Sequence, residues 1–208
     1  MLSSAELEEK YQVIRKNLEA RNYTVSLFPD AEAAASYLRD AIAGKTVGFG
    51  DSETLASMHL YDILSERCTV YDPMHRGSDG FVEAARRTLL TDIFLTSVNG
   101  AAETGELVNI DGTGNRVAGS LFGHEKVYFV FGRNKIAATL EEARKRARNF
   151  AAPLNAARHR FATPCAMAPG GCRDCSSPDR ICNAEIIHYR KMRFIDMEVI
   201  IIDQDLGL

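Results

Sequence analysis

The feature that most constrains the fold is a regular alternation of short apolar segments with amphipathic ones. The apolar segments have the length and the β-branched or aromatic content of buried strands. They are YTVSLF (23–28), KTVGFG (45–50), CTVYD (68–72), DIFLTSV (92–98), KVYFVFG (126–132) and FIDMEVIIID (194–203). Segments with helical periodicity accompany them at 3–22, 30–44, 51–67, 77–91 and 139–158. This order predicts an α/β fold: a mainly parallel open sheet with helices on both faces.

Two regions interrupt the alternation. Between about 101 and 120 the chain is rich in Gly, Asn and Thr, and we expect a loop, the strand ELVNI (106–110) and a tight turn at DGTGN (111–115). The second region, at about 163–183, holds four of the five cysteines and precedes the last strand. Between the cysteines and that strand lies AEIIHYRKMR (184–193), whose secondary structure the sequence pattern leaves ambiguous. We expect a single domain over residues 1–208 with a cysteine-rich insert.

Charge and hydropathy exclude several classes of protein. The net charge is -3, so nucleic acid and anionic membranes are poor partners. The longest apolar runs, such as VYFVF and EVIII, are far shorter than the roughly 20 residues of a membrane span. The first residues, MLSSAELEEKY, lack the basic and apolar regions of a secretory signal. We expect a cytoplasmic protein, where clustered cysteines more often bind metals or react than form structural disulfides.

The turn VGFGDSETL (47–55) lies between a strand and a helix and has two interpretations. Gly48 and Gly50 allow close approach of the backbone, and free N–H groups at the start of a helix favour a phosphate or a carboxylate. In the other interpretation this is a plain tight turn in which Asp51 or Ser52 caps the helix. The turn matches neither dinucleotide-binding nor Walker patterns, so no nucleotide cofactor is expected.

The segment 97–119 is the densest polar cluster, and it follows a strand whose carboxyl end should face the ligand crevice. Glu103 is a candidate nucleophile or general base, and Arg116 offers a fork of donors for an anion. The other candidate ligand-binding residues here are Thr104, Gly105, Asn109, Asp111 and Asn115. Alternatively, the Asn, Asp and Gly residues only shape a hairpin.

The cysteines Cys165, Cys172, Cys175 and Cys182 have the spacing C-x6-C-x2-C-x6-C. A two-residue gap lets two thiolates point at one metal, and four thiolates suit zinc or an iron–sulfur cluster. The spacing is neither that of a ferredoxin nor that of a zinc ribbon. A redox disulfide between the two central cysteines and four free thiols remain open as alternatives.

The other candidate residues are isolated in the sequence. His75, in DPMHRG, follows a strand and is a minor acid–base candidate. His159 and His188 are candidate extra metal ligands, and Cys68 is expected in the core. The histidine His59 lies in a helical segment, where packing is the expected role.

The string AETGELVNIDGTGNRVAG (102–119), followed by an apolar strand, resembles the core motif of the lactate utilization (LUD) domain of LutC/YkgG-type proteins. The VGFGDSETL turn and the order of elements agree with it, and PCAMAPGGCRDCSSPDRICN (164–183) resembles the tail of one branch of that family. The resemblance covers nearly the whole chain. It implies a sheet like that of the sugar-phosphate isomerase and CoA-transferase superfamily.

That superfamily holds anionic ligands at a glycine-rich strand–helix turn, and Gly48, Gly50, Asp51 and Ser52 occupy the analogous turn. Glu103 is the nearest counterpart of the acyl-accepting Glu of the CoA-transferases. Family members act with iron–sulfur or flavin partner subunits in oxidising lactate to pyruvate. The resemblance therefore favours a redox accessory or subunit that binds a small anion and carries an iron–sulfur cluster, with zinc as the alternative. An isomerase- or CoA-transferase-like enzyme using Glu103, or a non-catalytic ligand-binding regulator, are the other hypotheses.

Overall fold

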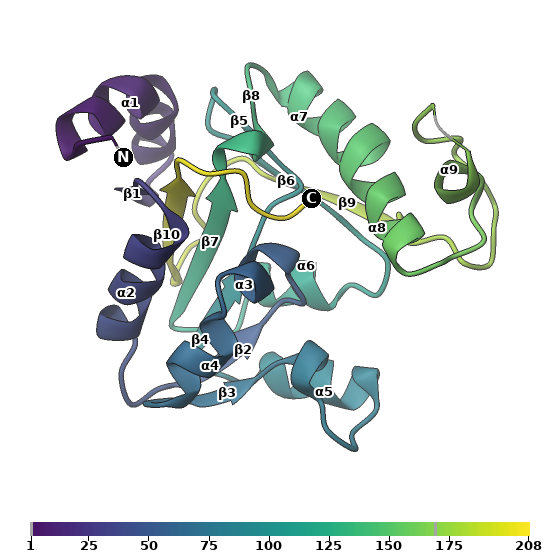
Figure 1. Ribbon diagram of the computed structural model, residues 1–208, viewed down its shortest axis with the longest axis horizontal. Helices are drawn as coiled ribbons and strands as arrows, with labels where there is room; N and C mark the ends of the chain where they lie inside the picture. The colour runs from purple at the N-terminus through teal and green to yellow at the C-terminus, as the bar shows by residue number, and fades with distance from the viewer. Residues whose placement is uncertain (1, 169) are drawn as a thin grey trace.

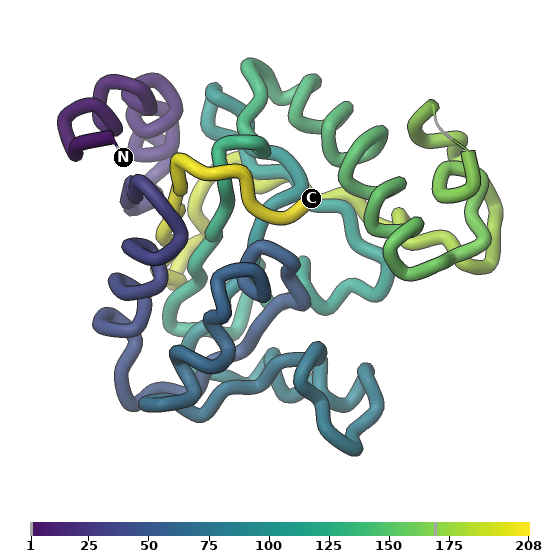
Figure 2. Tube along the Cα trace, viewed as in Figure 1, coloured from purple at the N-terminus to yellow at the C-terminus, as the bar shows by residue number. Residues whose placement is uncertain are grey.

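The computed structural model describes residues 2–168 and 170–208, and its centre is a six-stranded parallel sheet (Figure 1). The strands lie in the order β1-β10-β7-β4-β2-β3. Their bounds are β1 (Thr24–Phe28), β10 (Asp196–Ile202), β7 (Lys126–Gly132), β4 (Ile93–Thr96), β2 (Thr46–Phe49) and β3 (Thr69–Tyr71). All six were expected, and the α/β class is confirmed. The last strand, β10, lies between β1 and β7 (Figure 2).

Both faces of this sheet are covered, which explains why the central strands β4 and β7 are almost entirely apolar. In β7, Val127 and Phe129 pack into the cluster beneath α1 (Ser4–Ala20), whereas Tyr128 and Val130 pack into the cluster on the opposite face. Helices α2 (Ala31–Ala41), α3 (Glu53–Ser57) and α4 (Leu60–Ser65) cover that second face. Helices therefore lie on both faces, as predicted.

A second, four-stranded sheet shares the α1 side, in the order β8-β5-β6-β9. Its strands are β8 (Ile136–Ala137), β5 (Gly100–Ala102), β6 (Leu107–Asp111) and β9 (Ala184–His188). β6 is the expected strand, whereas the loop expected before it contains β5, which pairs with β6 as an antiparallel hairpin. β9 resolves the ambiguous segment as a strand. One continuous helix packs on the outer side of this sheet (Figure 1). It consists of α7 (Leu140–Arg146), the π-helical turn η3 (Ala147–Ala151) and α8 (Ala152–Arg158).

Helix starts follow the capping signals of the sequence. Ser3 and Glu6 form a capping box at α1, Asp30 caps α2, and Thr139 caps α7. The remaining elements are α5 (Phe81–Thr88), α6 (Asn115–Leu121), α9 (Pro164–Met167), and the short 3₁₀ turns η1 (Pro73–His75) and η2 (Arg133–Lys135). In residues 2–168 and 170–208, no helix has both the length and the apolar character needed to cross a membrane.

Two local predictions were wrong. The segment 51–67 is not one helix, because His59 takes a left-handed backbone conformation (φ 54°) and separates α3 from α4, with its side chain exposed. The turn expected at 111–115 continues into α6, because the carboxylate of Asp111 accepts from the backbone N–H groups of Thr113 and Gly114 and from Val117 in the first turn of the helix. The hydrophobic pattern reports neither the backbone conformation of His59 nor the hydrogen bonds of Asp111.

Candidate functional site

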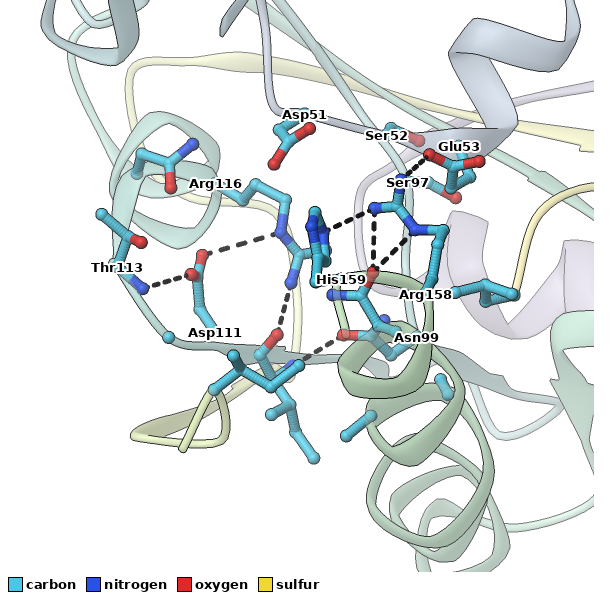
Figure 3. Close-up of a pocket in the computed structure, with 18 of the residues that line it drawn as sticks. Asp51, Ser52, Glu53, Ser97, Asn99, Asp111, Thr113, Arg116, Arg158 and His159 are labelled. Carbon is cyan, nitrogen blue, oxygen red and sulfur yellow. Dashed lines mark hydrogen bonds and ion pairs between the residues drawn. The ribbon is translucent and has the colours of Figure 1, made fainter. Parts of the chain in front are cut away.

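A cavity of about 520 Å³ lies at the carboxyl edge of the parallel sheet (Figure 3). β3 and β4 lie on opposite sides of β2, so the chain reverses its direction across the sheet at this point. Open α/β sheets bind ligands in the crevice outside such strand ends. The walls come from the segments after β2, β3, β4 and β7, from the β6–α6 turn and from α8. The crevice expected from the strand order is therefore a real cavity.

Asp51 follows β2 after Gly50 and projects into this cavity (Figure 3). Its backbone is left-handed (φ 50°), a conformation that costs energy for a residue with a side chain and that concentrates at functional sites. Burial raises the pKa of its carboxyl, while the charges of Arg116 and Arg158 act in the opposite direction. The next residue, Ser52, also lines the cavity and caps α3 by accepting from the Leu55 amide.

Arg116 comes from the first turn of α6 and faces Asp51 across the cavity (Figure 3). Its guanidinium donates to the carbonyl oxygen of Ile110 and lies 3.7 Å from the carboxylate of Asp111. Asp111 itself is occupied with the backbone of the turn. Asn115, beside them, lines the cavity, and its amide nitrogen has no hydrogen-bond partner in the described part of the chain. The arrangement leaves donors on two side chains free for a ligand.

The opposite wall comes from α8 and its C-terminal end. The guanidinium of Arg158 lies 2.5 Å from the carboxylate of Glu53 and donates to Asn155 Oδ1 at 2.9 Å. It is also 2.8 Å from Nε2 of His159, which lines the cavity with it (Figure 3). Arg158 is therefore already neutralised by a carboxylate, whereas Arg116 is paired less closely.

Two glycines of the predicted anion-binding turn have a packing role. A Cβ at Gly48 would lie 2.5 Å from the carbonyl oxygen of Thr88, and one at Gly50 would lie 2.8 Å from the hydroxyl of Thr96. Neither glycine is among the residues that line the cavity. Within this turn, Asp51 and Ser52 line the cavity, whereas the two glycines do not.

The hairpin turn with Glu103, Thr104 and Gly105 lies away from the cavity lining and packs on α1. There Arg21 donates to the carbonyl oxygen of Thr104 at 2.9 Å and forms an ion pair with the carboxylate of Glu106. Glu103, Thr104 and Gly105 were expected in the crevice. Instead, their turn contacts α1 and fixes that helix to the second sheet.

Two further candidates also lie outside the cavity lining. Asn109 is buried within β6, where its side-chain oxygen has no hydrogen-bond partner among the described residues. The ring of His75 is partly exposed, and its Nδ1 lies within hydrogen-bond distance, 2.7 Å, of Asp72 Oδ2. The same ring stacks on that of Tyr61 at a centroid distance of 3.8 Å. The Asp72–His75 pair is therefore close to the cavity wall formed by Pro73 but does not face the ligand space.

The four clustered cysteines meet at a second, narrow cavity of about 10 Å³. The lining cysteines are Cys165, Cys172, Cys175 and Cys182, and all four are free thiols. Within residues 2–168 and 170–208, no three His, Cys, Asp or Glu side chains are arranged to hold a single metal ion. The four cysteines therefore line one cavity next to α8, but their side chains are not gathered around a single point.

Cationic side chains surround these thiols. Burial by itself would raise the pKa of Cys172, but Nε of Arg148, 3.4 Å from its sulfur, and the Asp174 amide, 3.3 Å away, lower the pKa below its usual value. Burial raises the pKa of Cys182, against the charge of the neighbouring Arg180. The cavity therefore contains one activated thiol and one that stays protonated more readily.

The two histidines proposed as extra metal ligands lie elsewhere. His159 belongs to the first cavity, and His188 is buried in β9, 3.2 Å from the hydroxyl of Ser120, where burial lowers its pKa to about 4. The fifth cysteine, Cys68, packs against the core cluster under α2 and α4, as expected.

The two cavities share a wall. Ala152 and Ile181 line both of them, so one layer of side chains separates the ligand space from the four thiols. Ala152 follows the π-helical turn η3 directly, and such turns within helices occur frequently at functional sites. The cysteine-rich segment is therefore continuous with the first cavity and is not a distant appendage.

Several residues of the first cavity were missed from the sequence. They are Glu53, Ser97, Asn99, Lys135, Asn155 and Arg158. Ser97 and Lys135 follow the ends of β4 and β7, and position after a buried parallel strand is a signal that could have identified them. Arg158 and Asn155 had no such signal, because only the packing of α8 against the sheet edge brings them here.

Comparison with known proteins gives the chain its family. The LUD domain family model matches residues 11–202. Among solved structures, the chain is similar to the crystal structure of a DUF162 family protein from Deinococcus radiodurans, with 14% identity, a TM-score of 0.52, and 97% of this chain and 99% of that chain covered. That identity shows a common fold alone, and no curated protein matches the chain. Because the family model spans most of the sequence, this chain belongs to the LUD domain family.

Proposed function

We propose that this LUD domain protein is a redox-associated component of lactate or related 2-hydroxy acid oxidation, which binds a small carboxylate in the 520 Å³ cavity and holds an iron–sulfur cluster on its four cysteines. The observation that carries the proposal is the shared wall of Ala152 and Ile181. A ligand on one side and a cluster on the other would be separated by one layer of side chains. That proximity is what electron exchange between them requires.

The chemistry of the cavity favours a ligand with a carboxylate next to a hydroxyl or a carbonyl group. Arg116 uses one of its donors on the carbonyl of Ile110, so others are available for a carboxylate. The orphaned amide nitrogen of Asn115 is a further donor. Asp51, which lines the same cavity, is an acceptor for a hydroxyl group, and its raised pKa reduces its repulsion of an anion. These groups match the carboxylate and the 2-hydroxyl of a 2-hydroxy acid.

The second cavity offers the donor atoms of a cluster, four thiols, which would have to draw together to bind it. Four thiolates are the usual ligands of iron–sulfur clusters, and N–H donors near the sulfurs tune their potential. Arg148, Arg180 and the Asp174 amide supply positive charge and N–H groups here. When bound, the cluster would accept or donate one electron at a time. Zinc is the alternative occupant for the same four ligands.

Anaerobic reconstitution with iron and sulfide tests the cluster. The wild-type protein should acquire iron, sulfide and a broad visible absorption, and a C172S/C175S double variant should not. Cys68→Ser is the matched control, because Cys68 packs in the core away from the cluster of thiols, and it should behave as the wild type. A colourless wild-type protein without iron would refute the cluster. Zinc found in its place would favour the alternative occupant.

Calorimetry with lactate and with pyruvate tests the ligand site. Arg116→Ala should weaken binding by at least about tenfold, because a charged hydrogen bond in a partly buried site is lost. Arg133→Ala is the matched control, since Arg133 pairs with Asp203 and Asp205 outside the cavity. No binding of either acid to the wild-type protein would refute the proposed ligand class.

A further inference from the structure

Lys135 is a buried amine in the wall of the first cavity that the proposed carboxylate binding does not use. It ends the turn η2 after β7, and only 4% of its surface is exposed. Its Nζ donates to the hydroxyl of Thr54 at 2.9 Å and to the hydroxyl of Ser97 at 3.1 Å. Those two hydroxyls are themselves 3.2 Å apart. The amine is therefore held in one position at the edge of the ligand space.

The charges around Lys135 disfavour its protonated form. Buried lysines are normally paired with a carboxylate, but among the described residues the hydrogen-bond partners of this one are hydroxyls. Its pKa is lowered to about 7, chiefly by burial. The charges of Arg146 and Arg116 also lower the pKa, and the smaller effect of Glu53 raises it. A substantial fraction is thus a free amine at neutral pH, and a free amine is a nucleophile.

We propose that Lys135 attacks the carbonyl carbon of a 2-oxo acid bound in the cavity and forms an imine with it. This inference rests on the proposed binding of small carboxylates. The carbonyl group of a 2-oxo acid is bonded directly to its carboxylate. Arg116 and Lys135 line the same cavity, so a carboxylate held by Arg116 would place the adjoining carbonyl carbon in the space that the amine borders.

The reaction balances without an oxidant or a reductant. The lone pair of Nζ forms the C–N bond, the carbonyl π electrons move to oxygen, and a proton moves from nitrogen to oxygen to give a carbinolamine. A proton from the hydroxyl of Ser97 or Thr54 then moves to the carbinolamine oxygen, the nitrogen lone pair forms the C=N bond as the C–O bond breaks, and water leaves. The remaining N–H proton returns to that hydroxyl and gives the neutral imine. Ser97 and Thr54, within hydrogen-bond distance of Nζ, can accept and return a proton during these steps.

Trapping with cyanoborohydride tests the proposal. Wild-type protein incubated with pyruvate and cyanoborohydride should gain one reduced pyruvate adduct in the intact mass, and peptide mapping should place it on Lys135. Lactate lacks a carbonyl group and should give no adduct. Lys135→Met and Lys135→Arg should both lose the adduct, the second with its positive charge retained. Lys16→Met, which removes an exposed lysine, should keep it.

The pH dependence supplies an independent readout on the wild-type protein. Labelling of Lys135 should increase through about pH 7, whereas labelling of exposed lysines should become strong only toward pH 10. Adducts distributed over exposed lysines, or none on Lys135, would overturn the imine. If calorimetry still shows pyruvate binding in that case, the proposed ligand site survives and the imine alone fails. Absence of pyruvate and lactate binding refutes the ligand site, and the imine with it.

Discussion

Replacement of Lys135 by Met should change the pH dependence of stability in one direction. The folded-state pKa is about 7 against a reference of 10.5, so the native protein binds fewer protons than the unfolded chain between these values. Stability of the wild type therefore rises with pH across that window, by about 1.4 kcal/mol per pH unit. The full lowering of the Lys135 pKa corresponds to about 5 kcal/mol of unfolding free energy, which is a large part of the stability of a small domain.

The Met variant has no amine to titrate and lacks this rise. The difference in unfolding free energy, variant minus wild type, should be largest at and below about pH 7 and should decrease by about 3 kcal/mol by about pH 9.5. Loss of the hydrogen bonds to Thr54 and Ser97 adds a constant penalty of about 1–3 kcal/mol to the variant at all pH values. The change with pH, not the absolute difference, therefore reports the buried amine.

Urea unfolding followed by circular dichroism at several pH values measures this difference. Lys16→Met is the matched control, because Lys16 is exposed, and its difference from wild type should stay constant over the same range. A difference for Lys135→Met that is equally constant would refute the reasoning. It would mean that the amine keeps its proton and its solvation in the folded state, and that the nucleophile proposed above is absent.

Three other predictions concern residues outside this cavity wall. Gly48→Ala should cost roughly 1–3 kcal/mol of unfolding free energy, since its Cβ would meet a main-chain oxygen at 2.5 Å. Gly80→Ala is the control, because a Cβ at Gly80 would meet no atom within 4 Å, and it should cost less than about 1 kcal/mol. Equal losses of unfolding free energy in the two variants would contradict the packing role of Gly48. Arg148→Ala should slow alkylation of Cys172 at neutral pH by at least about twofold in mass-spectrometric assays, because the pKa of the thiol rises; an unchanged rate would exclude activation by the guanidinium. His188→Phe should remove about 3 kcal/mol of acid sensitivity between pH 6.5 and about 4 in urea titrations, because the unfolded chain binds the proton that the buried imidazole excludes. Equal acid sensitivity of that variant and the wild type would contradict it.

The six strands of the parallel sheet could be read from the sequence because they are short segments rich in β-branched and aromatic residues, and the central ones are buried on both faces. Of the second sheet, only β6 could be read from the sequence, as the strand ELVNI. β8 has two residues, and β9 mixes apolar with charged residues because its burial depends on β6. Strand order was equally hidden: nothing in the local pattern of β10 says that it pairs with β1 and β7.

The candidate site was predictable where a residue follows a strand or begins a helix. Asp51, Ser52 and Arg116 do so, and all three line the cavity. Glu103 also follows a strand, but β5 belongs to the second sheet, and its hairpin turn packs on α1. The four cysteines illustrate the opposite case, because their spacing alone indicated that they would gather, whereas their shared wall with the ligand space comes from tertiary packing.

The position of β10 has a consequence for how the chain is made. β1 and β7 are held together only through β10, and Ser26 meets Glu198 across 172 residues of sequence. While the chain emerges from the ribosome, β1 has no strand to pair with, and one edge of β7 stays open until residues 196–202 arrive. Long-range pairing of this kind slows folding, and open apolar edges aggregate. Nascent chains stalled before β10 should therefore depend on chaperones, and release of that one strand should complete the sheet.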